Sequence, residues 1–381
     1  MTPCQPLSQD EFNAWFRLLE TPGVGRRSAA GLLAHWGDIQ TVWSASPAQW
    51  AQVIGPAAAQ ALQSAPEAVF FQRQEAAWQW LQGRDDSQPA LKGSRRVVTW
   101  GSPEYPQRLA TLPDPPLMLY VTGSLTAWQR PSLAIVGSRN PTAQGLDHAQ
   151  AFAAALCRAG WGVISGLALG IDGAAHKGAL AALGTTVAVV GTGPDRIYPR
   201  RHHALACRII ESEGALVSEF PPGSPVRQEN FPLRNRIIAG LSLGTLVVEA
   251  AVESGSLITA KLALDAGREV FAIPGSIHSP QSKGCHALIR QGAKLVETAT
   301  DILEELAPQM EIDCTPHITA EVGDPDLERM GHDPVTLDTL AWRSHQSVSQ
   351  MAAQLLQWEL QGWVARLPGG LYQRRSPSMS R

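Results

Sequence analysis

The sequence predicts an α/β fold: an open, doubly wound and mostly parallel sheet, with an N-terminal helical module and a C-terminal winged helix. Three observations carry this prediction. Between residues 131 and 307, short apolar runs alternate with segments of helical period. The runs are continuously apolar, as expected for parallel strands covered on both faces. The last part of the chain has the order helix, helix, strand, turn, strand.

Residues 1–90 are expected to form a helical module of the SAM or helix-hairpin-helix type. Residues 8–85 are rich in Ala, Gln and Trp at helical spacing. The turn at 21–25 opens a helix that starts Arg26-Arg27, and residues 54–59 echo this turn. The N–H groups of such a turn can hold a DNA phosphate, but a turn between packed helices is equally consistent with these residues.

The central domain is expected to span residues 96–307. Two runs that flank a Pro-rich loop are expected to extend the neighbouring sheet, and helices such as 147–158 and 257–266 separate the main strands. The extending runs are 97–100 and 117–121; the main strands are 133–136, 162–165, 186–190, 215–218, 246–248 and 270–273, with 295–296 as a candidate seventh.

Residues 308–330 are expected to be an acidic linker, and residues 331–375 a winged helix with helices near 336–343 and 347–361. The second helix contains no Lys or Arg, so it would read a duplex groove weakly. A regulator that binds duplex DNA through this domain is therefore disfavoured, and a partner-binding role is at least as consistent. The polar tail after Gln373 is expected to be disordered.

Composition limits the class of protein. With 381 residues, 44% of them hydrophobic and 17% charged, the chain is long enough for two or three domains. It has no apolar run long enough for a membrane span and no signal-peptide pattern, so we expect a cytoplasmic protein without a membrane partner. The five cysteines are dispersed and form no Cys-x-x-Cys pair, which argues against a disulfide framework and a zinc site.

The net charge of −3 conceals an uneven distribution. Residues 131–296 carry 15 Lys and Arg against 11 Asp and Glu, a balance of +4. Residues 297–330 carry one Arg against ten acids, a balance of −9. The acidic stretch makes the whole chain negative, so its net charge does not exclude a basic surface on the middle domain.

Two arginines, Arg234 and Arg236, lie among apolar residues just before a predicted strand. An unpaired charge beside a buried strand is costly, so each arginine needs an anionic partner. No acid lies within residues 231–242, and the nearest in sequence are Glu229 and Glu249. Either one of these acids folds back onto the arginines, or the partner is an external anion such as phosphate.

Glycine-containing loops follow several predicted strands, at the edge where a doubly wound sheet binds ligands. Glycine lets the backbone approach a ligand, and N–H groups at a helix start can cradle an anion. Several such loops with arginines nearby favour a phosphate site. No Gly-x-Gly-x-x-Gly follows the first strand and no Walker A lysine motif occurs, so no NAD, ATP or other cofactor is expected. The loops include Gly137-Ser138-Arg139, residues 165–172, Gly191-Thr192-Gly193, residues 254–259 and Pro274-Gly275.

These motifs resemble those of the DNA-processing protein A family (DprA, also called Smf). The resemblance runs in order from about residue 97 to 307, and it includes Tyr198-Pro199 and residues 231–242. It implies an extended Rossmann-like fold that binds single-stranded DNA, protects incoming DNA and loads the RecA recombinase onto it during natural transformation. It also implies a homodimer, and we expect neither enzymatic activity nor catalytic residues.

The family's Gly-Ser-Arg arginine and nearby basic residues hold DNA phosphates, which carries over to Arg139 and, by a looser match, to Arg234, Arg236 and Lys177. A single strand is bound by a basic groove together with aromatic stacking of its bases. Many members carry Asn shortly after Tyr-Pro, where this chain has two arginines and two histidines. The expected DNA-contacting residues are Gly137, Ser138, Arg139, Ser165, Gly166, Gly170, Lys177, Gly191, Gly193, Arg200, Arg201, Phe231, Arg234, Asn235, Arg236, Ser254, Gly255, Ser256 and Thr259, with Tyr198 as a further stacking candidate.

Two further polar residues, Asp172 and His176, lie in or near the glycine-containing loop at 165–172. Asp172 is expected to cap a helix or orient an arginine, and His176 to be a satisfied histidine rather than a partner of Asp172.

The rival function is that of a nucleotide phosphoribohydrolase of the lysine-decarboxylase-like (LOG) class, which shares this sheet type. The glutamate of its Pro-Gly-Gly-x-Gly-Thr-x-x-Glu motif is replaced here by Ile258 or Thr259, so the general acid/base group is missing.

Overall fold

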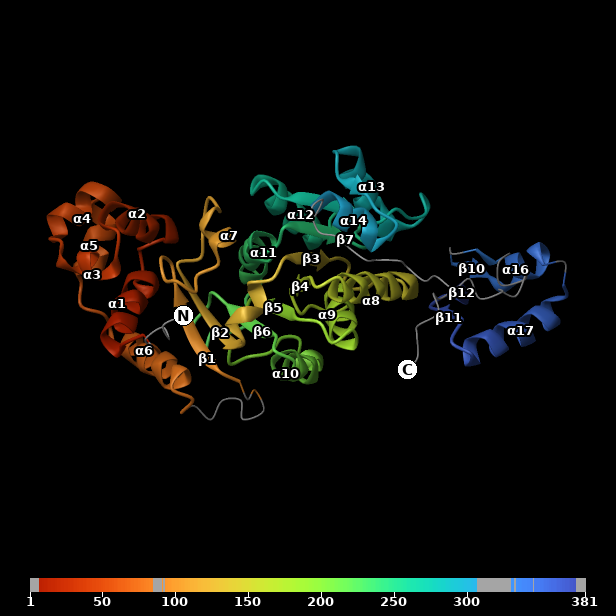
Figure 1. Ribbon diagram of the computed structural model, residues 1–381, viewed down its shortest axis with the longest axis horizontal. Helices are drawn as coiled ribbons and strands as arrows, with labels where there is room; N and C mark the ends of the chain where they lie inside the picture. Colours follow the sequence, from red (N-terminus) through yellow and green to blue (C-terminus); the bar gives the residue numbers. More distant parts are fainter. Residues whose placement is uncertain are drawn as a thin grey trace.

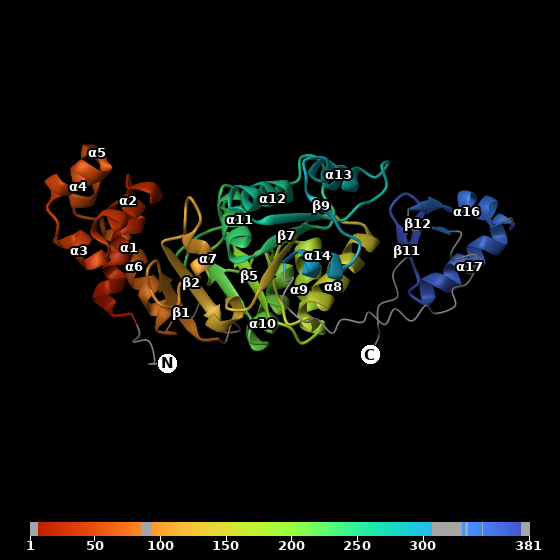
Figure 2. The ribbon, with the colours of Figure 1, turned by 45° about the horizontal axis from the view of Figure 1, so that its top comes forward.

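The computed structural model describes residues 7–84, 91, 93–306, 330–331, 334–344 and 346–374. The described chain forms a row of three parts: N-terminal helices, a central sheet with helices on both faces, and a small C-terminal domain (Figures 1 and 2). Nearly all of the predicted acidic linker, and the tail from residue 375, lie outside the described residues.

The N-terminal part is helical, as predicted, and an aromatic core holds it together. Phe12, Phe16 and Trp80 are buried in this core, which also contains Met118 and Tyr120 from the edge of the central sheet. The helices therefore pack against the sheet as well as against one another. They are α1 (Gln9–Glu20), α2 (Arg26–Trp36), α3 (Ile39–Ser44), α4 (Pro47–Ile54), α5 (Pro56–Gln63) and α6 (Ala68–Leu81).

The central sheet contains every predicted strand, including the candidate seventh. The order of its nine strands is β1-β2-β6-β5-β4-β3-β7-β8-β9. Strands β3 to β9 are mutually parallel, whereas β2 pairs antiparallel with both β1 and β6. The strands are β1 (Arg95–Thr99), β2 (Met118–Gly123), β3 (Ser132–Val136), β4 (Gly162–Ser165), β5 (Thr186–Val190), β6 (Ala215–Ser218), β7 (Gly244–Val247), β8 (Glu269–Ala272) and β9 (Lys294–Leu295).

Helices cover both faces of this sheet, which confirms the doubly wound prediction (Figure 2). Alternate strand residues face opposite cores: Ala134 packs with residues of α7, α11, α12 and α13, whereas Ile135 packs with residues of α8, α9 and α14. Strand order reverses between β3 and β7, and ligands of such sheets bind at this switch point. The helices are α7 (Gln107–Ala110), α8 (Ala143–Arg158), α9 (Ile171–Ala181), α10 (His203–Glu211), α11 (Asn230–Leu241), α12 (Gly255–Asp265), α13 (Lys283–Arg290) and α14 (Ala299–Leu306), with short 3-10 turns η1 (Leu125–Trp128), η2 (Arg200–His202) and η3 (Pro280–Ser282).

The C-terminal part is the predicted winged helix. Its small sheet has the order β10-β12-β11 and packs with two helices around Met351, Leu355 and Trp358. It meets the central domain where Gln373 Nε2 donates to Gln144 Oε1 of α8 at 2.9 Å. No described helix is long and apolar enough to cross a membrane. The elements are β10 (Val335–Thr336), α16 (Leu337–Arg343), α17 (Val348–Leu360), β11 (Val364–Leu367) and β12 (Leu371–Arg374).

Candidate nucleic-acid interface

The loops that follow the parallel strands are bonded to one another around the switch point. The Ser138 N–H donates to the Glu249 carbonyl at 2.7 Å, which joins the loops after β3 and β7. The Ile171 N–H donates to the Ser138 carbonyl at 3.1 Å, which joins the loops after β3 and β4. Gly170 has φ +78°, and a Cβ there would overlap the Ser138 carbonyl. Glycine is required at this position by close backbone packing.

Exposed Arg139 and Tyr198 and half-buried Phe231 form a group that we call the cation–aromatic cluster. The Arg139 Cζ lies 5.6 Å from the centroid of the Phe231 ring, within range of a cation–π interaction. The Tyr198 ring lies 5.8 Å from the same ring, and Tyr198 is 45% exposed. Phe231 covers Gly191, where a Cβ would lie 3.1 Å from the ring. The cluster offers a cation and two aromatic rings on one surface.

The position of Phe231 on helix α11 is fixed by buried polar side chains of that helix, which form hydrogen bonds with the sheet and its loops. Asn230 Nδ2 donates to the Gly191 carbonyl at 3.0 Å. Arg234 Nη1 donates to the Gly166 carbonyl at 2.7 Å and also to the Val189 carbonyl. Burial lowers the pKa of Arg234 to about 10, while the carboxylate of Asp172 raises it.

Arg234 therefore has a structural role, and its contact with a DNA phosphate stays a prediction that this buried position disfavours. Only 4% of its surface is exposed, and its bonds go to the protein backbone. The charge of Asp172 favours the charged form of Arg234, and its predicted role in orienting an arginine stays a prediction. The other alternative, a helix cap, is wrong because the N-cap of α9 is Gly170. Asp172 Oδ2 instead accepts from the N–H groups of Gly166 at 3.1 Å and Ala168 at 3.3 Å.

Arg236 is also paired inside the protein, with partners that the sequence analysis did not name. Its Nε lies 3.2 Å from Asp114 Oδ2, and its Nη2 lies 2.5 Å from Glu219 Oε1. Burial lowers the pKa of Arg236, but these carboxylates outweigh burial and raise it. The arginine does need anions, and its partners in the fold are Asp114 and Glu219 rather than Glu229 or Glu249. A DNA contact of Arg236 stays a prediction that these two ion pairs disfavour.

Glu249 occupies the start of α8, next to the Gly137–Arg139 loop. Its carboxylate accepts from the Thr142 N–H at 2.9 Å and from the Thr142 hydroxyl at 2.5 Å. A Cβ on Gly145 would lie 2.6 Å from a carboxylate oxygen of Glu249, so glycine makes room for the acid. Burial raises the pKa of Glu249. The positive end of this helix thus already holds a protein anion.

Several other predicted residues also have structural roles. Ser165 is buried and donates to the Ile135 carbonyl at 2.6 Å. The Gly193 N–H donates to the Ser224 carbonyl at 3.2 Å, which joins the loops after β5 and β6. Ser254 caps α12, while Ser256 and Thr259 are buried.

Other predicted residues remain accessible. Asn235 Nδ2 reaches the Gly255 carbonyl at 3.5 Å, and Gly255 itself is exposed. Lys177 on α9 and both Arg200 and Arg201 in η2 are exposed. The exposed basic side chains on this list are therefore Arg139, Lys177, Arg200 and Arg201.

Sequence reasoning missed residues that shape or extend this surface. His202 Nδ1 pairs with the Leu167 carbonyl at 2.9 Å and so places η2, with its two arginines, beside the loop after β4. Arg196 and Arg227 are exposed in the loops after β5 and β6. Their position in the loops that follow predicted strands was the signal that could have found them.

His176 is buried, but the prediction that it is a fully satisfied histidine is wrong, because its buried Nε2 has no hydrogen-bond partner among the described residues. Its Nδ1 lies 2.7 Å from Thr186 Oγ1, and that hydroxyl donates its own proton to the Val163 carbonyl. The Nδ1 of His176 must therefore carry the proton of a neutral ring. Complete burial lowers the pKa of His176 to about 3.

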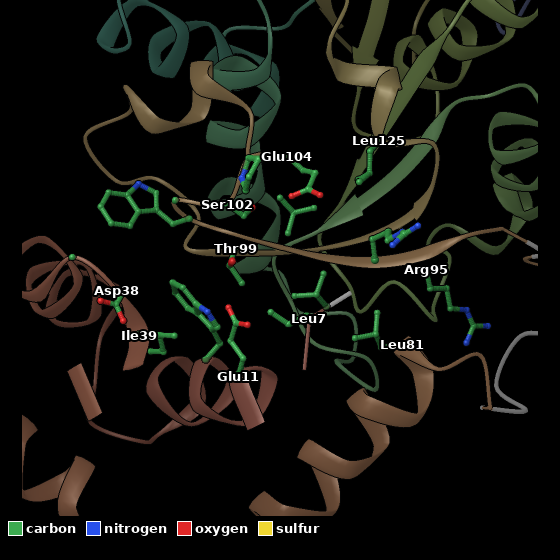
Figure 3. A pocket seen from close by; sticks show the side chains of 18 of the residues that line it. Leu7, Glu11, Asp38, Ile39, Leu81, Arg95, Thr99, Ser102, Glu104 and Leu125 are labelled. Atoms are coloured by element: carbon green, nitrogen blue, oxygen red, sulfur yellow. The ribbon is translucent and has the colours of Figure 1, made fainter. Parts of the chain in front are cut away.

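A cavity of about 580 Å³ lies away from this surface, between the N-terminal helices and β1 (Figure 3). Its lining includes the acids Glu11, Asp38 and Glu104 together with Arg95 and Arg96. Carboxylates in this lining oppose phosphate binding. Among the described residues, no group of three or more His, Cys, Asp or Glu is placed to hold a metal ion.

Residues 96–307 match the family model described as DNA recombination-mediator protein A. Protein Smf of Escherichia coli is 44% identical over 292 residues, which cover 74% of this chain and 78% of that protein. This chain belongs to the DprA/Smf family. A model of the DprA winged-helix domain matches residues 326–370.

The chain is also similar to a second curated relative and to solved structures of DprA proteins. DNA processing protein DprA of Streptococcus pneumoniae is 45% identical over 201 residues, 53% of this chain and 71% of that protein. An X-ray structure of DprA from Streptococcus pneumoniae matches with a TM-score of 0.65 at 32% identity, covering 79% of this chain and 99% of that one. A structure of Helicobacter pylori DprA, described as giving insights into single-stranded DNA binding, has a TM-score of 0.50 and 28% identity, covering 55% of this chain and 95% of that one.

Proposed function

We propose that this protein binds single-stranded DNA at the loops following the parallel strands and acts in DNA processing during natural transformation. It would protect incoming DNA and load RecA onto it, as a cytoplasmic homodimer without enzymatic activity. The observation that carries the proposal is the cation–aromatic cluster, in which exposed Arg139 lies over Phe231 beside Tyr198. A guanidinium can hold a phosphate while the rings stack on unpaired bases.

The charges around the cluster fit a strand better than a single nucleotide. Arg196, Arg200, Arg201 and Arg227 are exposed on loops or turns that follow neighbouring strands. Separate cations along one edge can neutralise successive phosphates of a polymer. Family membership supports the same function, because relatives carry the name DNA processing protein and one is described as binding single-stranded DNA.

The hydrolase alternative has little support from this geometry. Ile258 and Thr259 stand where that class has its glutamate, and Thr259 is buried. Glu249, one possible substitute, is bound by Thr142 at the start of α8. Glu253, the other, is exposed before the turn into α12. A general acid needs a defined position beside the scissile bond, and neither residue supplies one.

We also propose four units along the chain: a helical module at 1–90, the DNA-binding domain at 96–307, a linker at 308–330 and the winged helix at 331–375. The first boundary is supported by the gap between α6, which ends at Leu81, and β1, which begins at Arg95. The second is supported by the family model that ends at residue 307. The winged-helix model begins at residue 326, inside the proposed linker.

The proposal is tested by fluorescence anisotropy of a labelled single strand, titrated at several salt concentrations with Arg139→Ala. Each phosphate contact of a single strand adds about 0.7 to the slope of log affinity against log salt. Arg139→Ala should therefore weaken binding and lower that slope by about 0.7. The control is Arg158→Ala, which removes an exposed arginine from the other end of α8.

Unchanged affinity in Arg139→Ala would overturn the site. Duplex DNA and a nucleoside monophosphate serve as competitors, and efficient displacement by the mononucleotide would favour the hydrolase. RecA loading is tested separately, by asking whether the protein accelerates RecA assembly on the same strand.

A further inference from the structure

Four charged side chains form a closed arrangement that we call the charge ring: Arg26, Asp114, Glu219 and Arg236. Arg26 reaches Asp114 at 3.1 Å and Glu219 at 3.3 Å. Arg236 reaches the same two carboxylates at 3.2 Å and 2.5 Å. Each arginine bridges both acids, and the formal charges cancel. The Glu219 and Arg236 side chains are only 11% and 9% exposed, so the ring is partly shielded from water.

The charge ring joins parts that are far apart in sequence. Arg26 is the first residue of α2 in the N-terminal helices, and Asp114 lies in the loop between β1 and β2. Glu219 directly follows β6, and Arg236 lies on α11. Phe231 of the cation–aromatic cluster is five residues before Arg236 on that same helix, about 7.5 Å along its axis. One set of ion pairs therefore links the N-terminal helices to the element that carries the aromatic surface.

The position of Arg26 is unfavourable for α2 itself. A cation in the first turn meets the positive end of the helix dipole, and α2 has no acid in that turn to offset it. Its N-cap is Gly25, which provides no side-chain cap. The ion pairs of Arg26 with Asp114 and Glu219 offset this unfavourable interaction with the helix dipole. These bonds also occupy the guanidinium, so Arg26 is poorly placed to hold a DNA phosphate.

We propose that Arg26 is a positioning residue for DNA binding: through the charge ring, the N-terminal helices set the position of α11 and thereby raise the affinity of the cation–aromatic cluster for a single strand. This inference deepens the proposed function and depends on it. Without Arg26, Asp114 and Glu219 share a single arginine, and a negative charge is left uncompensated beside α11. The helix then loses one of its constraints without losing any group that contacts DNA.

The test uses the full-length chain with Arg26→Ala, the conservative Arg26→Lys, and Arg27→Ala as the matched control. Arg27 is the next residue and is exposed. The Arg27→Ala substitution therefore removes the same charge without changing the charge ring. Two quantities are measured: single-strand affinity as a function of salt, and hydrogen exchange of the α11 amides without DNA. Arg26→Ala should bind roughly two- to tenfold more weakly with an unchanged salt slope, and its α11 amides should exchange faster. Arg26→Lys should recover part of both effects.

Other results would contradict the positioning role of Arg26. A salt slope that falls by about 0.7 in Arg26→Ala would mean that Arg26 contacts a phosphate directly, which overturns the positioning role. Equal effects of Arg26→Ala and Arg27→Ala, or no change in affinity and exchange, would overturn it as well. If the wild-type protein fails to bind the strand, the proposed function fails. The exchange of the α11 amides then still decides whether the charge ring constrains that helix.

Discussion

Substituting Gly166 with alanine tests whether the glycines of the site serve protein packing or ligand approach. A Cβ on Gly166 would lie 2.6 Å from Arg234 Cζ, well inside van der Waals contact. Arg234 is 4% exposed and donates to the carbonyls of Gly166 and Val189, so it has little room to move. Hydrogen bonds to a charged donor are each worth about 1.5–3 kcal/mol. Displacing this guanidinium should therefore destabilise the central domain by about 3–5 kcal/mol.

Gly255→Ala is the matched control, because both glycines were expected to approach phosphate. Gly255 is exposed, and nothing lies within 4 Å of the position of its Cβ. It is the first residue of α12, where alanine should be neutral or stabilising by up to about 1 kcal/mol. Hydrogen exchange of β4 and β5 amides at increasing urea would measure the change within the central domain. A loss below about 1 kcal/mol for Gly166→Ala, or a larger loss for Gly255→Ala, would refute the packing argument.

Three further predictions follow from the same contacts. His176 has a lowered pKa of about 3 and stays neutral in the fold, so the unfolded chain binds the extra proton below about pH 6.5. Stability should therefore fall as the pH drops, by about 2 kcal/mol at pH 5, and an equally steep dependence in His176→Gln would contradict this. Phe231→Leu should weaken single-strand binding by about 1–3 kcal/mol through lost stacking, with an unchanged salt slope. The control is Phe220→Leu, at a half-buried phenylalanine in the loop after β6, which should bind normally. Glu249→Gln should lower stability by about 1–2 kcal/mol because the start of α8 loses an anion, and a similar loss in exposed Glu253→Gln would argue against this cause.

The sheet could be predicted from sequence because parallel strands buried on both faces leave a local signature. The run Thr186–Val190 is continuously apolar apart from its first residue, and it forms β5 with those bounds. The extension of the sheet by β1 and β2 and the winged helix were predicted from the same kind of local pattern, but the antiparallel direction of the extension was not. The secondary structure of these elements is specified by the pattern of residues close together in the chain, and such a pattern can be read from the sequence.

The partners of the buried arginines could not be predicted in this way. Arg236 pairs with Asp114, 122 positions away, whereas Glu249, nearer in sequence, binds Thr142 instead. The cause is the register of β2 against β6, which places Tyr120 opposite Ser218. The start of β2 therefore lies beside the end of β6, and Asp114 comes close to Glu219. Only the strand order of the assembled sheet contains this information.

The division between paired and exposed arginines indicates what kind of ligand the site suits. Arg234 is bonded to backbone carbonyls and Arg236 is paired with carboxylates inside the protein. Protein carboxylates also occupy the amide of Gly166 and the start of α8. At these two positions a protein carboxylate takes the place that a phosphate would need. The exposed Arg139 lies in water, where one ion pair is worth at most about 1 kcal/mol. Useful affinity must then come from many weak contacts along a chain of phosphates and bases, so it should rise with strand length, and a mononucleotide should compete poorly.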